Sequence, residues 1–306
     1  MVARPIHAAI TFDLHDVDDP ADVRFTATRL RDAGVSATFF IPSSLLAEPR
    51  YREVYGELIS LGHEPASHSH LHDRDEYSAM ARGDRTRLDF LEKSRDLHAE
   101  FFGRAPLSFR APFWGKIAPE TARRLAGLGY IADASATPQR LPFLSSSPFR
   151  KGWLFAPRAP YELAPGLLEI PTSCLGIPAG ASTFPMLRKR ASLAYLELLR
   201  LEARCFGNRV IVTMHHVEDF NPNSKRGQPD KFGPLDLLPL PTGGFGFRHH
   251  IRDNDPKRIA ATHEALLAWF ANLKCMTLSA IAEEWKAPAG SRETANGSSR
   301  IPSRAQ

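Results

Sequence analysis

Short apolar runs alternate along the chain with longer stretches in which apolar residues recur three or four positions apart. Residues 7–13 (HAAITFD) are typical of a buried strand, and residues 21–32 follow with helical spacing and end before Gly34. Strands and helices that alternate in this way indicate parallel strands with right-handed crossovers, and hence a barrel or a doubly wound sheet. The pattern predicts strands at 7–13, 36–41, 63–67, 107–110, 130–133, 167–170, 210–214 and 275–278, and helices at 21–32, 51–61, 76–101, 119–128, 187–205, 256–273 and 279–285.

Two long segments without a clear hydrophobic period interrupt the alternation. Residues 137–165 are rich in Pro, Ser and aromatic residues, and residues 221–250 carry repeated prolines and a Gly-Gly pair. Loops of this length in a compact domain are usually functional or disordered. We expect one domain over residues 1–287 with insertions at about 137–165 and 221–250, and a disordered tail over residues 288–306, where Ser, Gly, Arg and Pro prevail.

Composition and charge narrow the class of protein. The 306 residues are 43% hydrophobic and 24% charged, a mixture that can bury a core and excludes a wholly disordered chain. Basic side chains number 39 and acidic ones 34, and the formal net charge of +5 is spread without a Lys/Arg block. We therefore expect no nucleic-acid partner, whereas an anionic substrate remains compatible with this charge.

The cysteines and the absence of targeting segments bear on the compartment. Cys174, Cys205 and Cys275 lie far apart and form no CxxC pair, which is typical of reduced thiols and not of a disulfide frame or a thiolate zinc site. No signal-peptide pattern is visible, and no apolar run approaches the roughly 18 residues that a membrane span needs. We expect a cytoplasmic protein without a transmembrane segment, and the sequence indicates no oligomeric state.

Two histidines four positions apart are the strongest chemical signal. His68 and His72 follow the predicted strand 63–67 in the run SHSHLH. On one helical turn their rings would point the same way, and two imidazoles on one side suit Zn²⁺ or another borderline divalent ion. A polar surface loop that is rich in histidine would give the same run, so these residues alone leave both interpretations open.

Acidic residues stand where the first predicted strand ends. Asp13 and Asp16 are placed at the carboxyl end of a parallel strand, where active sites form in such folds. Capping of the following helix is the other role for an acid at this place. Asp18, Asp19 and Asp22 are better situated for it, because Asp13 and Asp16 lie too far upstream.

Two later strand ends carry further candidate groups. Arg110 can pair with a carboxylate and hold it ionised, and Phe113 and Trp114 beside it could form the floor of a sugar site. A surface ion pair and ordinary core packing are the alternatives for these three residues. His215 and His216 end a strongly apolar strand, and a core histidine bonded to backbone would look the same.

In this order the segments resemble the motifs of the polysaccharide deacetylases, also called carbohydrate esterase family 4 or the NodB-homology domain. Thr11-Phe12-Asp13 matches the first motif, Thr-Phe-Asp-Asp, and then departs from it. His68-Ser69-His70-Leu71-His72 matches the second, His-Ser/Thr-x-x-His, in full. Arg110-Ala111-Pro112-Phe113 matches the third, Asp133 is the candidate for the Asp of the fourth, and Met214-His215 ends a strand as the fifth motif does.

The resemblance extends over about residues 7–286 and implies a fold and roles for the matched residues. The implied fold is a distorted (β/α) barrel of seven or eight parallel strands in a single domain. The implied roles are Asp13 as general base, His68 and His72 as metal ligands, His215 as general acid, Arg110 as the partner that orients Asp13, Asp133 as the group that tunes His215, and Pro112, Phe113 and Trp114 as substrate contacts.

The third metal ligand is the point where the sequence departs from the family. The family takes it from an Asp one or two residues after the base, where this chain has Leu14 and His15. We favour Asp16, which requires a local turn, over His15, which would make an all-histidine site. A different register would make Asp16 the base and Asp18 the ligand.

The resemblance implies a hydrolase that depends on a divalent metal, with Zn²⁺ expected first and Co²⁺, Ni²⁺ or Mn²⁺ as alternatives. It would remove an N-acyl group, expected to be acetyl, from a substrate that contains an amino sugar. The alternatives are a deformylase or other amidase acting on a lipid-linked or small substrate, and an inactive barrel that binds carbohydrate. No role is assigned to His216 or to the segment 221–250.

Overall fold

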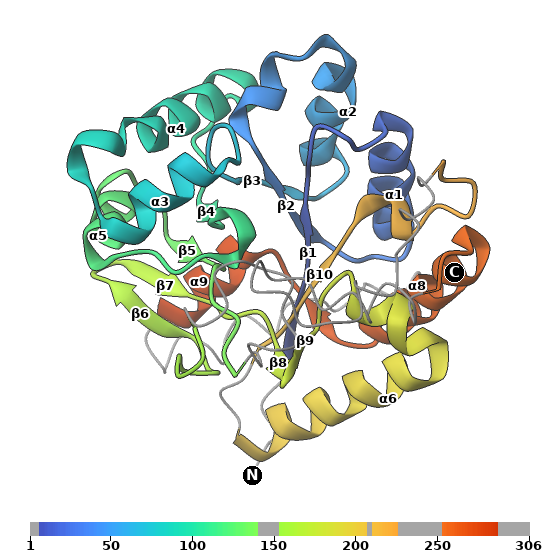
Figure 1. The fold of residues 1–306 in the computed structure, drawn as a ribbon. Coiled ribbons are helices and arrows are strands. Elements are labelled where there is room, and N and C mark those ends of the chain that lie inside the picture. Colours follow the sequence, from blue (N-terminus) through green and yellow to red (C-terminus); the bar gives the residue numbers. More distant parts are fainter. Residues whose placement is uncertain (1–5, 140–152, 207–209, 226–252, 287–306) are drawn as a thin grey trace, which may run out of the picture.

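A single sheet curls into a half-barrel, and helices cover its outer face (Figure 1). The computed structural model describes residues 6–139, 153–206, 210–225 and 253–286. The strands of this sheet are β1 (His7–Asp13), β2 (Ala37–Ile41), β3 (Glu64–Ser67), β4 (Ser108–Phe109), β5 (Ala132–Asp133), β6 (Tyr161–Ala164), β7 (Leu167–Glu169), β10 (Ile211–His215) and β11 (Lys274–Cys275). The helices are α1 (Pro20–Asp32), α2 (Pro49–Ser60), α3 (Arg74–Arg82), α4 (Asp89–Phe102), α5 (Pro119–Gly127), α6 (Thr183–Phe206), α8 (Pro256–Phe270) and α9 (Leu278–Lys286).

The strands run in the order β10-β1-β2-β3-β4-β5-β7-β6, with β11 paired to the start of β1. The seven strands from β10 to β7 are parallel, and only β6 at the edge pairs antiparallel with β7. The distorted barrel with seven or eight parallel strands is therefore confirmed. Among the described strands it is an open half-barrel and not a closed ring.

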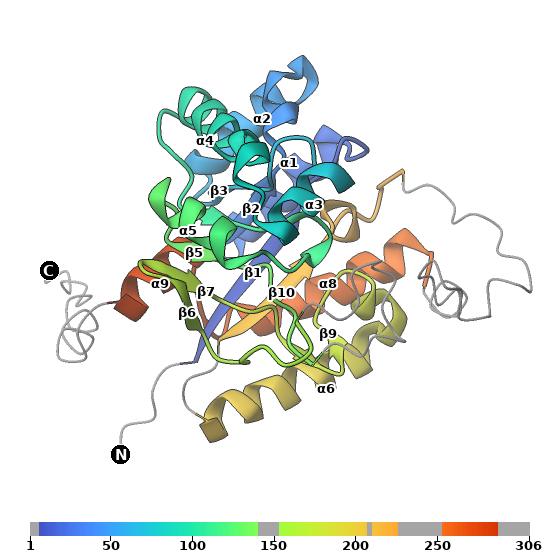
Figure 2. The same cartoon turned by 60° about the vertical axis from the view of Figure 1, so that its left-hand side comes forward.

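Side chains of β1 alternate between two apolar layers. Ala8, Ile10 and Phe12 pack in the outer layer between the sheet and helices α1, α2, α6 and α8, whereas Ala9 packs inside the barrel. Thr11 and Asp13 share the inner face with Ala9 by the same period of two. Figure 2 shows α6 and α8 side by side against the outer face of β10.

An irregular segment extends the sheet from β7 back toward β10. It holds the short hairpin of β8 (Cys174–Leu175) and β9 (Ile177–Pro178). Its backbone follows β10, because Ser173 N donates to Val212 O at 2.9 Å and Met214 N donates to Ala179 O at 3.0 Å. This segment therefore continues the sheet beside β10, where regular strand pairing stops.

Helix α9 closes the amino-terminal end of the barrel. Its first backbone groups meet polar side chains inside the sheet: Leu278 N donates to Thr38 Oγ1 at 3.0 Å and Ser279 N to Glu64 Oε2 at 3.2 Å. Glu64 is 6% exposed and also accepts from the hydroxyls of Thr38 and Ser108. This buried carboxylate therefore ties β2, β3, β4 and α9 together.

The structure corrects two local predictions. The single helix expected over 76–101 is two helices, α3 and α4, because Gly83 adopts a left-handed φ of 67° and ends α3. Residues 161–164, expected to be irregular, form β6. The centres of the predicted insertions, residues 140–152 and 226–250, and the tail from residue 288 lie outside the described residues.

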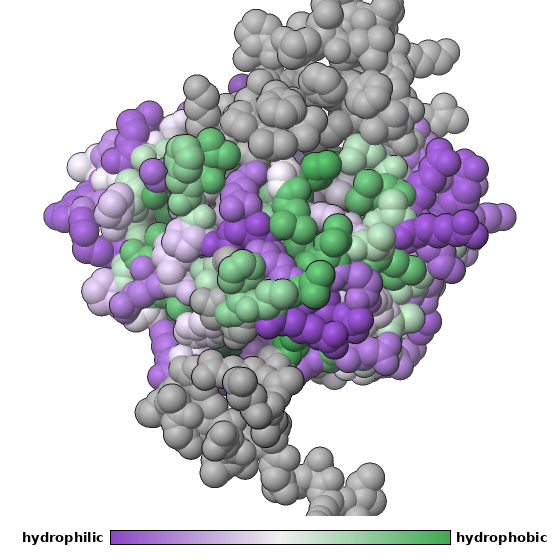
Figure 3. All heavy atoms as spheres, turned by 90° about the horizontal axis from the view of Figure 1, so that it is seen from below, coloured by the Kyte–Doolittle hydropathy of each residue, from purple (hydrophilic) through white to green (hydrophobic). Residues whose placement is uncertain are grey.

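Helix α6 leaves part of its apolar surface in solvent. Leu198, Leu201 and Phe206 are more than half exposed. Figure 3, which views the molecule from below, shows green apolar residues interrupted by purple hydrophilic ones.

Within the described part of the chain, no helix combines the length and the apolar character that a bilayer span requires.

Candidate metal centre and active site

Three imidazoles converge at the carboxyl ends of β1 and β3. His15 follows β1, His68 follows β3, and His72 stands in the loop before α3. One ring nitrogen from each lies within 4.8 Å of the other two. The ring centroids of His68 and His72 are 4.5 Å apart, and those of His15 and His72 are 5.0 Å apart. Nitrogen donors in this arrangement fit one divalent cation.

The second motif reaches this geometry through a loop and not through a helical turn. Ser69 and His72 have φ values of 69° and 59°, so the chain from residue 68 to 72 winds with two left-handed residues. The expectation that His68 and His72 face the same way is met, but the helical reason given for it is wrong. The left-handed residues turn the chain back, and α3 begins only at Arg74.

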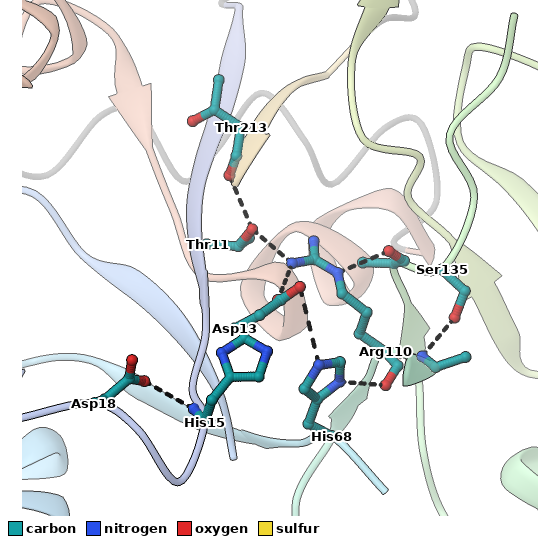
Figure 4. A network of polar contacts seen from close by, with 10 residues as sticks. Thr11, Asp13, His15, Asp18, His68, Arg110, Ser135 and Thr213 are labelled. Atoms are coloured by element: carbon teal, nitrogen blue, oxygen red, sulfur yellow. Dashed lines mark hydrogen bonds and ion pairs between the residues drawn. The ribbon is translucent and has the colours of Figure 1, made fainter. Parts of the chain in front are cut away.

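Asp13 lies beside this cluster and is held by Arg110 (Figure 4). Arg110 Nη1 donates to Asp13 Oδ1 at 2.5 Å and to Thr11 Oγ1 at 3.0 Å, and Arg110 Nε donates to Ala134 O at 2.9 Å. The guanidinium also lies over the ring of Phe40, 4.3 Å from its centroid. These contacts hold the Arg110 guanidinium in place, and the guanidinium in turn binds Oδ1 of Asp13.

Charge decides the protonation state of Asp13. Burial would raise the pKa of its carboxyl group, but the charge of the Arg110 guanidinium outweighs burial and lowers this pKa to about 2. Asp13 is therefore ionised at neutral pH. Its Oδ2 lies 3.9 Å from His68 Nε2.

The three imidazoles are neutral in the absence of a cation. Burial, followed by the neighbouring His72, lowers the pKa of His68 well below its ordinary value, and burial with His216 and His72 lowers that of His15 to about 4. Burial also lowers the pKa of His72. His68 Nδ1 donates to Arg110 O at 2.8 Å, which leaves Nε2 as the nitrogen on the Asp13 side. Neutral rings with a free lone pair are what a metal ligand needs.

Asp16, the favoured third ligand, does not join the cluster. Its side chain is exposed, while its backbone carbonyl accepts from Arg50 Nη2 and from the Tyr51 hydroxyl. The chain turns directly after His15, where His15 N donates to Asp18 Oδ2 at 2.7 Å. The structure therefore brings His15 to the centre, directs Asp16 outward, and engages Asp18 in the turn.

His215, the expected general acid, points to the other face of the sheet. It pairs with Phe12 in the β1–β10 register, so it shares the outer face with Phe12 and not the inner face with Asp13. Its ring stacks on Phe184 at 5.0 Å, and its Nε2 lies 2.9 Å from Thr213 Oγ1. The residue is completely buried in the helix layer, which corrects its assignment to the site.

His216 occupies the inner side that was expected for His215. Its ring centroid lies 5.9 Å from that of His15, and the residue is partly exposed. The signal for this was present in the strand: Val210 and Val212 pack inside the barrel, and a period of two continues through Met214 to His216.

Asp133 supports the Arg110 loop and not a histidine. Its Oδ1 accepts from Ser135 Oγ at 2.6 Å, and Ser135 Oγ in turn accepts from Ala111 N at 2.9 Å. Burial raises the pKa of Asp133 to about 6, and the adjacent Glu169, also fully buried, has a pKa well above its ordinary value. The expected link from Asp133 to His215 is wrong, because His215 shares the outer face with Phe12, while the Asp133 carboxyl group interacts with Ser135 and Glu169.

The third motif places an aromatic side chain at the edge of the centre. The ring of Phe113 lies 5.0 Å from that of His72, and Phe113 and Trp114 have φ values of 61° and 52°. Trp114 packs so closely on Gly180 that an added Cβ there would lie 2.9 Å from its ring. Pro112 is buried under this turn. Phe113 therefore borders the cluster directly, whereas Trp114 packs against the segment after β9.

One family model matches the first part of the chain. The model of the polysaccharide deacetylase family matches residues 3–132, which contain β1 to β4 and reach β5. No curated protein sequence matches the chain. The residues that carry Asp13, the three imidazoles and Arg110 all lie within this match.

Solved structures resemble the chain at low sequence identity. A proposed polysaccharide deacetylase from Mycobacterium smegmatis is 19% identical, with 92% of this chain and 90% of that chain covered at a TM-score of 0.56. The Xyl-CE4 domain of a multidomain xylanase from the hindgut metagenome of Trinervitermes trinervoides is 13% identical at a TM-score of 0.46, over 93% of each chain. An allantoinase is 13% identical at a TM-score of 0.47, over 69% of this chain and 78% of that chain.

At these identities the first structure supports the fold alone, and the other two, with TM-scores below 0.5, carry no argument. The family match adds the motifs to that fold. The resemblance to the polysaccharide deacetylase family is therefore confirmed, with residues 3–132 as the part of the chain that carries its signature.

Proposed function

We propose that the protein is a hydrolase that removes an N-acetyl group from a substrate containing an amino sugar, with a divalent cation held by His15, His68 and His72. The observation that carries this proposal is the convergence of three neutral imidazoles beside an ionised carboxylate. The family match over residues 3–132 supports deacetylation as the reaction.

The donor set fits a borderline divalent ion. Three imidazole nitrogens are typical of zinc sites that keep an open coordination position, and Co²⁺, Ni²⁺ and Mn²⁺ accept similar ligands. When bound, such an ion lowers the pKa of water and polarises an acyl carbonyl. The Nδ1 bond of His68 to the Arg110 carbonyl fixes the ring for this purpose.

Asp13 is suited to take the proton of the attacking water. Arg110 keeps its carboxylate ionised and fixed through Oδ1, and Oδ2 faces the imidazole cluster. A carboxylate with a pKa of about 2 is a weak base in bulk water, so its effect here depends on position next to an acidified water. Proton transfer by a positioned side chain typically contributes about 10²–10⁴-fold to the rate.

His216 is suited to protonate the departing amine. It lies beside His15 on the inner side of the sheet and is accessible from solvent in part. Breaking the amide bond leaves an electron pair on nitrogen, and a proton donor beside the cluster would complete the reaction. This role belonged to His215 in the sequence prediction, and we transfer it to the neighbouring residue.

The aromatic edge supports a sugar-containing substrate. Phe113 presents a half-buried ring next to His72, and apolar sugar faces pack on such rings. Amides of other kinds, including formamido sugars and small cyclic amides, would also fit a water-activating centre.

The test combines metal analysis with product release. Purified protein should contain about one divalent ion per chain and should release acetate from at least one acetamido sugar, and a chelator should stop this release until Zn²⁺ is restored. Release of formate from formamido sugars, without release of acetate from acetamido sugars, would show that the acyl group removed is formyl and not acetyl. Stoichiometric metal with no hydrolysis of any amide or ester would contradict the enzyme and favour a binding module.

A further inference from the structure

The buried carboxylate of Glu76 binds successive backbone amides of the loop at residues 68–72, which we call the histidine loop. Glu76 accepts from three successive amides: His70 N at 3.2 Å, Leu71 N at 2.9 Å and His72 N at 3.2 Å. It also accepts from Ser69 Oγ at 2.6 Å. Successive N–H groups that point at one anion form a nest, and here the anion belongs to the protein itself.

The loop needs such an anchor because its backbone is unfavourable. Ser69 and His72 have φ values of 69° and 59°, and left-handed residues other than Gly persist only where their surroundings hold them. The other side of the loop is held by Ser43 N and Ser94 Oγ, which donate to Ser69 O at 3.1 and 2.9 Å. Glu76 holds the opposite side of the loop, including the amide of His72.

The position of Glu76 is itself fixed by a helix. It is the third residue of α3, where Asp73 caps the helix by accepting from Glu76 N at 2.8 Å. The side chain points back over the preceding loop and is 6% exposed. A carboxylate in the first turn of a helix is also stabilised by the helix dipole. The first turn of α3 is thereby joined to the backbone that carries His72.

We propose that Glu76 is a positioning residue of the metal centre: by binding the amides of residues 70–72 it sets the direction of the His72 ring. This inference rests on the proposed function, because it assumes that His72 is a ligand. Glu76 does not touch the cation in this proposal. It acts through the loop, as partners beyond the ligands do when they orient them, and their loss typically weakens metal affinity by about 10–100-fold.

Glu64 provides a matched control. It is a glutamate of the same 6% exposure that accepts from Thr38, Ser108 and Ser279, but it lies at the start of β3 and the loop follows the end of that strand. The same change, Glu to Gln, replaces one acceptor oxygen by a donor at both places. Loss of stability should therefore be similar, and only the effect on the metal centre should differ.

The experiment measures Zn²⁺ affinity by competition titration of chelator-treated protein, the absorption spectrum of the Co²⁺ form, and the free energy of unfolding in urea. We expect Glu76→Gln to weaken Zn²⁺ binding by about 10–100-fold and to change the Co²⁺ spectrum, because a Gln amide has one acceptor oxygen and no charge with which to hold the three N–H groups. Glu64→Gln should lower stability and leave Zn²⁺ affinity at the wild-type value. Wild-type affinity in Glu76→Gln, or an equal loss in Glu64→Gln, would overturn the inference.

Ser69→Ala decides the question if Glu76→Gln does not fold. It removes one hydrogen bond to Glu76 and keeps the backbone, so Zn²⁺ affinity should fall about fivefold, the value of one such bond. Unchanged affinity in this variant would also overturn the inference. A wild-type protein that binds no Zn²⁺ would instead contradict the proposed function. Zn²⁺ binding and acetate release by the wild type, with no effect of either variant, would reject the role of Glu76 alone.

Discussion

Two groups of histidines lie on opposite sides of the sheet. On the inner face the nitrogens of His15, His68 and His72 converge within 4.8 Å of one another. On the outer face His215 and His263 have ring centroids 5.2 Å apart, but their nitrogens turn to different partners: Thr213 Oγ1 for His215, and Ile259 O for His263. Close rings therefore do not by themselves make a metal site.

The surroundings of the two groups also differ. The outer pair is fully buried among aromatic rings such as Phe184 and Phe220, so it serves packing between β10 and α8. The inner group lies at the strand ends, close to the ionised Asp13 and the partly exposed His216. Three convergent lone pairs and access for solvent distinguish the inner group as a reaction centre. A nearby carboxylate does not, because the outer pair also has one: Asp219 Oδ2 lies 3.8 Å from His263 Nε2.

The largest effect should come from removing an inner imidazole. His15→Ala should weaken Zn²⁺ binding by more than about 100-fold, which exceeds the loss typical of partners beyond the ligands, and should bring acetate release below detection. His263→Ala on the outer face should keep wild-type Zn²⁺ affinity and lower the free energy of unfolding by about 2–4 kcal/mol, because it leaves a cavity and unpaired groups. Competition titration and urea unfolding measure the two quantities.

Asp16→Ala serves as the local control for His15. The Asp16 side chain is exposed and outside the cluster, so Zn²⁺ affinity should stay within about threefold of the wild type, a change of less than 1 kcal/mol. A loss in Asp16→Ala comparable to that in His15→Ala would restore Asp16 as the third ligand. The inner group would then not be a site of three imidazoles.

Next in size is the change of the proposed base. Asp13→Asn should lower kcat by about 10²–10³-fold, since it removes proton transfer by a positioned group, and should leave the three imidazoles able to bind Zn²⁺. The variant also leaves Arg110 buried without its charged partner, so unfolding must be measured alongside. Full activity in folded Asp13→Asn would contradict its role.

A smaller effect is expected for the proposed proton donor. His216→Gln should lower kcat by about 10²-fold with little change in KM, whereas His215→Gln should leave kcat within about twofold. The pair differs by one position in the chain and by the face of the sheet on which each ring lies. The reverse outcome, with His215 alone affecting kcat, would mean that the inner and outer faces of β10 are exchanged.

The smallest effect concerns the pH dependence of stability in metal-free protein. Burial, followed by His263, lowers the pKa of His215 well below its ordinary value of 6.5. Below pH 6.5 the unfolded chain therefore binds a proton that the folded protein excludes, and stability falls as pH decreases, by at most about 1.4 kcal/mol per pH unit for this group. His215→Gln should flatten the decline between pH 6.5 and 5 in urea unfolding, and an unchanged slope would show that His215 is not neutral in the folded state.

Much of the site could be predicted because its residue types stand at strand ends. Asp13, His68, His72 and Arg110 each follow or end a predicted strand, and parallel strands bring their carboxyl ends to one edge. The order of the motifs predicted the fold, and the alternation of apolar runs with helical spacing predicted most of the strands and helices. The break at Gly83 and the short strand β6 were missed, since a local glycine and an edge pairing leave little hydrophobic period.

The sequence by itself determined which chemistry is present: the imidazoles, the acid with its arginine, and the parallel strands that carry them. Only the tertiary structure showed which of two neighbouring residues lies at the centre: His15 and not Asp16, and His216 and not His215. It also showed that Asp133 interacts with the Arg110 loop through Ser135. For His215 and His216 the physical reason is the period of two along a strand, which turns adjacent side chains to opposite faces. For His15 and Asp16 it is the turn that follows β1, in which His15 N donates to Asp18 Oδ2. A shift of one residue is almost invisible in a motif, but it moves a ring from the reaction centre into the core.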